Sequence, residues 1–480
     1  MALKHNDKMN NSELGRGLKG RQITMISVGG VIGAGLFVGS SNAIATAGPA
    51  VILSYLVAAA IIVLVMQMLG EMATARPDTG SFSSYADLAI GRWAGFTIGW
   101  LYWWFYLLVV AIEAIVAGNI LALWVPLPPW SCALAIALVL MVTNCLNVKN
   151  FGELEYWLAF IKVASIVLFI IIGLAAIAGL IPGSSVSGIH NLWSNEGFAP
   201  NGWVAVVSGL LIAMFSFQGS EIVTIAAAES AEPSKNIRKA IRAVVWRLGL
   251  FYIGSMFVVV CLIPWNAPGL KVGSYQAVLS AMNIPGAALI MQFIVLVAVM
   301  SCLNSAIYTS SRMAYSLARR GDAPASLGQT TPQGVPLKSI LSTSGVAIVI
   351  LCLNYVAPKS FFDFLLSTSG AIALLMYLVI AVTQIFMRKK LVAEGVTLDV
   401  KMWLYPWLTW FTIALIAGVM IIMIVFPTYR LELLSTLGIT AGLIVVGKIL
   451  EKAQPDVSAR RQGKPAPREC GKKIRLGEEL

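Results

Sequence analysis

The sequence predicts an all-α integral membrane protein with twelve spanning helices. Of the 480 residues, 58% are hydrophobic and 12% are charged, and the mean hydropathy is +0.82. Soluble globular domains have a far more polar composition. Apolar runs of spanning length recur along the chain, and basic residues gather in alternate connections between them. These observations exclude a water-soluble fold.

Twelve apolar segments are long enough to cross a bilayer, which takes roughly 17 to 25 residues, or more in a tilted helix. In chain order they are residues 23–45, 51–73, 93–124, 130–146, 157–181, 203–228, 243–263, 287–307, 339–356, 361–386, 403–426 and 431–449. The first segment follows a polar tail and is too long for a secretory signal, so we expect it to remain in the mature protein.

The net charge of +12 indicates a topology and not a nucleic-acid partner. Lysines and arginines precede the first segment, follow the sixth, eighth and tenth, and recur after the twelfth. The alternate loops carry only Lys271, Lys359 and Arg430. Cytoplasmic loops carry such an excess, so we predict a multi-pass protein of the inner membrane with both termini in the cytoplasm.

The chain outside the apolar segments leaves no room for a soluble catalytic domain. We predict a cytoplasmic tail over residues 1–20, a twelve-helix domain over 21–450, and a basic, disordered cytoplasmic tail over 451–480. No GxxxxGK[ST] motif is present, the six cysteines fall singly, and the two histidines lie outside the apolar segments. We therefore predict no enzyme, no metal centre and no cofactor.

The first and sixth segments should be interrupted in the middle of the bilayer. Residues 29–39 contain five glycines, and residues 215–221 place Ser, Gln, Gly and Glu together. Close packing of small residues is the alternative explanation for the glycines. However, the two segments hold equivalent positions in two successive groups of five, which predicts a 5+5 inverted repeat with paired broken helices.

Such breaks expose backbone N–H groups at one half-helix end and C=O groups at the other, where lipid cannot satisfy them. The positive half-helix end suits a carboxylate, and the free carbonyls suit an ammonium. A zwitterionic amino acid would complete both ends at once. The sequence therefore predicts a transporter of such a molecule, with a channel or a membrane receptor as the alternative from another class.

Several motifs carry a family resemblance. Residues 30–39 (GVIGAGLFVG), 77–82 (PDTGSF), 215–221 (FSFQGSE) and 311–313 (SRM) are, in this order, similar to the amino acid transporter family of the amino acid-polyamine-organocation (APC) superfamily. Longer stretches resemble bacterial permeases for 4-aminobutyrate (GABA): residues 91–96, 100–104, 221–230, 319–324 and 402–407. The resemblance implies a leucine-transporter-type fold and import of GABA by proton symport. Carriers of aromatic amino acids, proline or small neutral amino acids share most of these motifs and remain alternatives.

The same resemblance implies which residues bind the substrate. Main-chain amides near Gly33, Ala34 and Gly35 would take its carboxylate. Main-chain carbonyls of Phe215, Ser216 and Gln218 would take its amine. The neighbouring Ile32 and Gly219 complete the predicted binding set.

Three ionisable residues inside the membrane, Lys162, Glu113 and Glu221, are candidates for coupling or gating. A charge in hydrocarbon costs about 3 kcal/mol even on the mildest scale, so each needs a reason. The resemblance places a lysine at Lys162, where sodium-coupled relatives hold an ion, so its ammonium would substitute for sodium; a static pin between helices is the alternative. Glu113 and Glu221 could carry a proton, contact the substrate amine, or form a structural hydrogen bond. The predicted partners are an amino acid, protons and the lipid bilayer, and the sequence does not give the oligomeric state.

Overall fold

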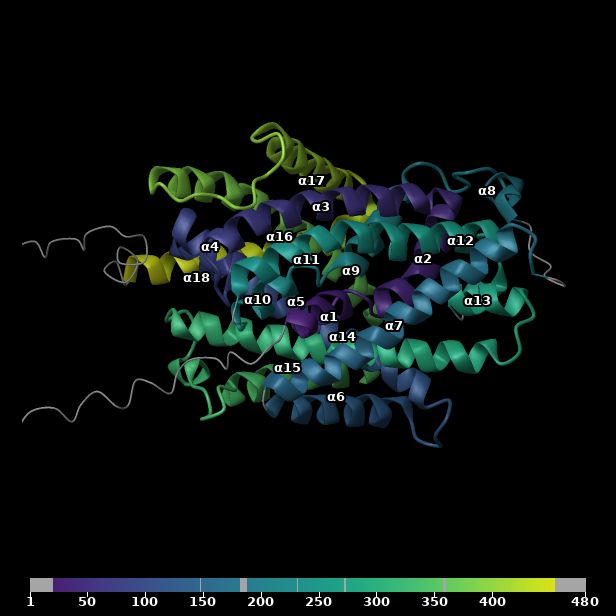
Figure 1. Ribbon diagram of the computed structural model, residues 1–480, viewed down its shortest axis with the longest axis horizontal. Helices are drawn as coiled ribbons and strands as arrows, with labels where there is room; N and C mark the ends of the chain where they lie inside the picture. The colour runs from purple at the N-terminus through teal and green to yellow at the C-terminus, as the bar shows by residue number, and fades with distance from the viewer. Residues whose placement is uncertain are drawn as a thin grey trace, which may run out of the picture.

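Long apolar helices make up the molecule and lie roughly along its longest axis (Figure 1). The computed structural model describes residues 20–146, 148–181, 188–230, 232–271, 273–356 and 360–453. The predicted tails, residues 1–20 and 451–480, lie outside these ranges except for residues 20 and 451–453.

The first half of the chain contains the helices α1 (Gly20–Gly29), η1 (Gly35–Gly39), α2 (Ser40–Ala47), η2 (Gly48–Ala50), α3 (Val51–Ala75), α4 (Ser81–Ala89), α5 (Arg92–Leu121), α6 (Pro129–Cys145), α7 (Val148–Ile177), η3 (Gly188–His190), α8 (Asn191–Ser194), α9 (Ala205–Phe217) and α10 (Ile222–Ala228). The second half contains α11 (Pro233–Arg247), η4 (Leu248–Gly254), α12 (Ser255–Leu262), η5 (Pro268–Lys271), α13 (Ser274–Ala281), α14 (Ala287–Arg319), η6 (Ala325–Gly328), α15 (Leu337–Val356), α16 (Ser360–Ala393), α17 (Trp407–Val425) and α18 (Pro427–Ala453). Of the short elements, η1 and η4 are π-helices, and the others are 3₁₀-helices.

Nine helical stretches within the described residues are long and apolar enough to cross a membrane. Two further apolar helices, Pro129–Cys145 and Gly249–Leu262, are shorter. The first stretch, Gly35–Ala75, covers the second half of the first predicted segment and all of the second, because η2 joins α2 to α3 with little interruption. The all-α membrane class is confirmed, while the number of twelve crossings stays a prediction.

Both predicted helix interruptions are confirmed at the predicted residues. The helix α1 ends at Gly29, and η1 begins only at Gly35. In the sixth segment, α9 ends at Phe217 and α10 begins at Ile222. Gly219, between them, has a φ of +109°, in the left-handed region that a side chain disfavours.

The helix α5 lies inside the bundle and packs against α14, α6, α18 and α4. Its most apolar stretch is 78% buried, whereas the corresponding stretches of α17 and α18 are 28% and 22% buried. The apolar side chains that α17 and α18 expose are suited to contact with lipid. The helix α5 therefore carries its polar residues into the interior, and α17 and α18 form part of the outer surface.

The helices α14, α16 and α18 all end at one end of the molecule, on the left in Figure 1, while α8 and α13 lie toward the opposite end. Their last turns carry Arg319, Lys390 and Lys452. Two buried ion pairs join elements at this end. Arg92 Nε lies 2.9 Å from Asp322 Oδ1, and Arg312 Nε lies 3.2 Å from Glu229 Oε1.

Removing one partner of a buried ion pair should destabilise the fold much more than removing one partner of an exposed pair. Asp322→Ala leaves the Arg92 guanidinium buried without its carboxylate, which costs about 3 to 5 kcal/mol. Arg76→Ala breaks the exposed pair with Glu394, which is worth at most about 1 kcal/mol. Thermal unfolding of the purified variants in one detergent should show a much lower Tm for Asp322→Ala. Equal Tm values would contradict this.

Candidate substrate site

The two helix breaks meet backbone to backbone. A Cβ atom added at Gly35 would lie 2.6 Å from the Cα atom of Ser216, and one added at Gly219 would contact the carbonyl oxygen of Gly30. Such an approach is possible only because glycine has no side chain. The local sequence thus explains both the unwinding and the contact between the breaks.

The amide at the break in the first helix is bound by a side chain of the protein. Ala34 N donates to both carboxylate oxygens of Glu113, at 3.0 Å each. Glu113 comes from the interior helix α5 and is only 1% exposed. A carboxylate of the protein therefore occupies the amide that we predicted to bind the substrate carboxylate.

A carbonyl of the same break is bound by the predicted lysine. Lys162 Nζ donates to Ile32 O at 2.8 Å and to Ala298 O at 3.4 Å, which ties α7 to the break and to α14. Lys162 is fully buried, and the carboxylates of Glu155 and Glu113 interact electrostatically with its ammonium group. Glu155 itself accepts from Ser301 Oγ and, at 3.3 Å, from Asn304 Nδ2. The ammonium of Lys162 therefore lies at a carbonyl of the helix-one break.

Tyr252 connects the two breaks, and sequence analysis missed it. Its hydroxyl lies 2.8 Å from Val31 O and 2.8 Å from Ser216 O, one carbonyl from each break. One hydroxyl donates to one carbonyl at a time. In the sequence, Tyr252 is simply a tyrosine within an apolar segment. This feature is too common to indicate such a role.

Glu221 holds the break in the sixth helix in shape. Its carboxylate accepts from Tyr102 and Tyr106 hydroxyls at 3.1 Å each, from Gln218 Nε2 at 3.2 Å and from Gly219 N at 3.1 Å. Both tyrosines come from α5. Four donors surround the carboxylate of Glu221. This arrangement fits the alternative in which Glu221 forms structural hydrogen bonds.

A small cavity of about 10 Å³ lies where the breaks meet, which is about the space of one water molecule. Its lining includes five of the predicted residues, namely Gly33, Gly35, Phe215, Ser216 and Gln218, together with Glu113. Gln218 Oε1 is buried and has no hydrogen-bond partner among the described residues. An amino acid does not fit this space, so the site is closed in this conformation.

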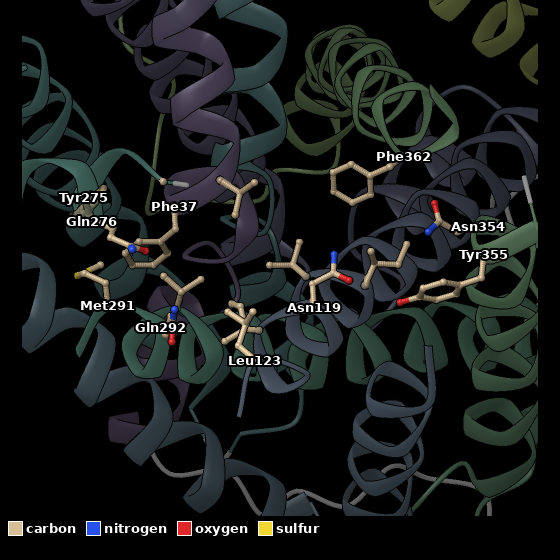
Figure 2. Close-up of a pocket in the computed structure, with 16 residues that line it drawn as sticks. Phe37, Asn119, Leu123, Tyr275, Gln276, Met291, Gln292, Asn354, Tyr355 and Phe362 are labelled. Carbon is tan, nitrogen blue, oxygen red and sulfur yellow. The ribbon is translucent and has the colours of Figure 1, made fainter. Parts of the chain in front are cut away.

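A second cavity, of about 650 Å³, is shown in Figure 2. Phe37 and Val38 of η1 and Ile115 and Val116 of α5 line it, a few residues beyond Ala34 and Glu113 in the chain. The Phe37 ring packs on Tyr275, with centroids 4.9 Å apart. None of the described residues that line the cavity is charged. The two cavities are thus lined by neighbouring stretches of the first helix and of α5.

No group of three or more His, Cys, Asp or Glu side chains that could hold a metal ion occurs in the part of the chain that the structure describes. The polar groups of the site are backbone amides and carbonyls, two carboxylates, an ammonium and tyrosine hydroxyls. A set of this kind can bind the polar and charged groups of a small solute.

The comparisons with known proteins agree with this geometry. A family model described as "Amino acid permease" matches residues 22–456. The "Gamma-aminobutyric acid permease" of Escherichia coli (strain K12) is 57% identical over 91% of this chain and 93% of its own length. The "Probable GABA permease" of Pseudomonas aeruginosa is 53% identical over 95% of this chain and 97% of its own length.

A solved structure shows the same fold at low sequence identity. The manganese transporter of Eremococcus coleocola aligns with a TM-score of 0.56 and 13% identity over 96% of this chain and 97% of its own. That likeness supports the leucine-transporter-type architecture and says nothing about substrate. The family match over residues 22–456 and the two bacterial relatives decide the class: the chain is a multi-pass membrane transporter, not an enzyme, and it belongs to the amino acid permease family.

Proposed function

We propose that this protein is a secondary active transporter that imports GABA together with protons. It would lie in the inner membrane with twelve crossings in a 5+5 inverted repeat and with both termini in the cytoplasm. The basic last turns of α14, α16 and α18 at one end of the molecule support this orientation. The identity to two bacterial GABA permeases supports the substrate.

One observation carries the proposal. Within the helix-one break the protein supplies its own carboxylate to an amide and its own ammonium to a carbonyl, through Glu113 at Ala34 and Lys162 at Ile32. The unwound backbone therefore binds both charge types that a zwitterion carries. A site of this chemistry suits an amino acid better than a single ion or an uncharged solute.

In the proposed bound state, the amides near Gly33, Ala34 and Gly35 hold the substrate carboxylate. The carbonyls of Phe215, Ser216 and Gln218 hold its amine, with Gly219 leaving room for the turn. Lys162 takes the place of a sodium ion behind the first helix, and Glu113 is the second candidate for the proton. Tyr252 would release one carbonyl when substrate enters.

The proposal is tested by uptake into proteoliposomes with an imposed pH gradient, with and without sodium. We expect saturable accumulation of labelled GABA that follows the pH gradient and does not need sodium. A channel or a receptor would not accumulate the solute above equilibrium. Accumulation that requires sodium and ignores the pH gradient would contradict proton symport.

Competition should identify the substrate within the family. GABA has three carbons between its carboxyl carbon and its amine, so its site must span a longer gap than that of an α-amino acid carrier. Unlabelled compounds with this spacing should inhibit uptake at least about tenfold better than phenylalanine or proline, a difference of about 1.4 kcal/mol in binding. Stronger inhibition by phenylalanine or proline would keep the amino acid permease class and reject GABA.

A further inference from the structure

Glu113 holds the position in which a substrate carboxylate would bind. Both of its oxygens lie 3.0 Å from Ala34 N, at the start of the helical backbone that follows the break. A Cβ atom at Gly33 would contact Glu113 Oε1, so the carboxylate packs directly on the unwound chain. The remaining space at this point holds about one water molecule. Two carboxylates cannot share this amide.

We propose that Glu113 is an internal competitor of the substrate carboxylate, and that its displacement is the step that binds the proton. This inference rests on the proposed function and deepens it. In the empty site the ionised Glu113 accepts from Ala34 N. When the substrate carboxylate takes that amide, Glu113 loses its backbone donor and binds one proton from the outer aqueous side.

The surroundings of Glu113 explain why a displaced carboxylate should be protonated. The titratable and charged groups that face it from the neighbouring elements are Lys162 on α7, Cys302 on α14, Tyr252 on η4 and Tyr106 on its own helix. Lys162 is bound to Ile32 O and is also acted on by Glu155, and Tyr252 is bound to the carbonyls of the breaks. A buried carboxylate that loses its donor is strongly disfavoured in its charged form.

The other acidic candidate does not have this arrangement. Glu221 accepts four hydrogen bonds within its own break and from α5, and none of its donors is a helix-one amide. A substrate carboxylate at Ala34 would therefore leave the hydrogen bonds of Glu221 in place. This difference assigns the competition to Glu113.

The proton balance of the step is simple. One O–H bond forms on Glu113 when the zwitterion binds, and the same proton leaves to the cytoplasm when the zwitterion departs and Glu113 returns to Ala34 N. Because the linkage is reciprocal, a proton that favours substrate binding is itself bound more tightly when substrate is present. One proton would therefore move with each substrate molecule through this residue.

Proton uptake on binding is the direct test. Purified protein in detergent is titrated with GABA by calorimetry at one pH in buffers that differ in ionisation enthalpy, which counts the protons taken up. The wild type should take up close to one proton per GABA, and its Kd should rise by up to about tenfold per pH unit where Glu113 is ionised. Glu113→Gln should take up close to none, with a Kd that does not follow pH.

Glu153→Gln is the matched control. Glu153 lies near the start of α7, forms an exposed ion pair with Arg21, and is distant in sequence from the helix-one break. It should keep the wild-type proton count. The same proton count in wild type and Glu113→Gln would overturn the inference, and so would no uptake in the wild type. The latter result is expected if Glu113 stays ionised and pairs with the substrate ammonium instead.

A second measurement keeps the inference testable if Glu113→Gln does not fold. In the wild type, butyrate keeps the carboxylate and n-butylamine keeps only the amine. Inhibition of GABA binding by butyrate should strengthen as the pH falls, and inhibition by n-butylamine should not. A pH dependence that both compounds share, or that only the amine shows, would overturn the inference.

Exchange of labelled amino acid across the membrane of liposomes that contain the wild type distinguishes a failure of the proposed function from a failure of the inference about Glu113. If neither GABA nor phenylalanine nor proline exchanges, the proposed function fails. If exchange is normal but the proton count does not depend on Glu113, the proposed function stands and only this inference fails.

Discussion

Replacing Gly33 with leucine should weaken substrate binding at least about a hundredfold, and reduce uptake with it, while the protein still reaches the membrane. A Cβ atom at this position would contact Glu113 Oε1 and would lie 2.8 Å from both Cβ and Sγ of Cys302. The larger side chain would have to push the break away from α5 and α14. Forced packing of this kind costs roughly 3 kcal/mol, so we expect the Kd to weaken by at least about a hundredfold. Binding of labelled GABA to the purified protein measures it.

Val38→Leu is the control for this change. Val38 lies one turn further along and lines the 650 Å³ cavity, where an added methylene has room. Its Kd should stay within about twofold of the wild type, well below the 1.4 kcal/mol of a tenfold change. A Gly33→Leu protein that is present in the membrane and binds with normal affinity would refute the substrate site at the helix-one break.

Replacing Lys162 with methionine should strongly reduce the accumulation of substrate that the pH gradient drives. The change deletes the ammonium and leaves the carbonyls of Ile32 and Ala298 without this donor. Since the lysine is fully buried, no solvent can replace it in the closed conformation. We expect accumulation to fall at least about tenfold, because losing a buried charged donor is worth more than about 1.5 kcal/mol. Uptake into proteoliposomes with an imposed pH gradient measures it.

Lys235→Met provides the comparison, because Lys235 forms an exposed pair with Glu232 three residues away. It should accumulate GABA as the wild type does. Undiminished accumulation in Lys162→Met would leave proton symport standing and would remove Lys162 from the mechanism.

The helix breaks could be predicted from sequence because their causes are local. Five glycines within residues 29–39 and the polar run at 215–221 weaken the helix where they stand, whatever surrounds them. The position of Lys162 followed from a family resemblance, and the structure brings its ammonium to a helix-one carbonyl. Features that depend on a short stretch of chain could therefore be predicted from the sequence.

The contacts made by Glu113 and Tyr252 could not be predicted in the same way. Glu113 is 79 residues from Ala34 in the chain, and its hydrogen bond depends on how α5 is rotated and placed against the break. Tyr252 reaches two carbonyls only because η4 packs near both breaks. From the sequence alone, Glu113 and Glu221 were equal candidates. Their hydrogen-bond partners distinguish them, because Glu113 binds the amide of the helix-one break and Glu221 stabilises the turn in its own break.

In the proposed transporter, a solute that came to the helix-one break through the large cavity of Figure 2 would first meet a lining without charged side chains among the described residues. Its described lining offers amide side chains, such as Asn119, Gln276 and Asn354, beside aromatic and aliphatic groups, and no fixed charge. A neutral vestibule does not focus an electric field, so it concentrates neither cations nor anions. A zwitterion has no net charge and enters such a space without competition from an accumulated atmosphere of salt ions. On this proposal, discrimination by charge would begin at the amide and carbonyls of the helix-one break.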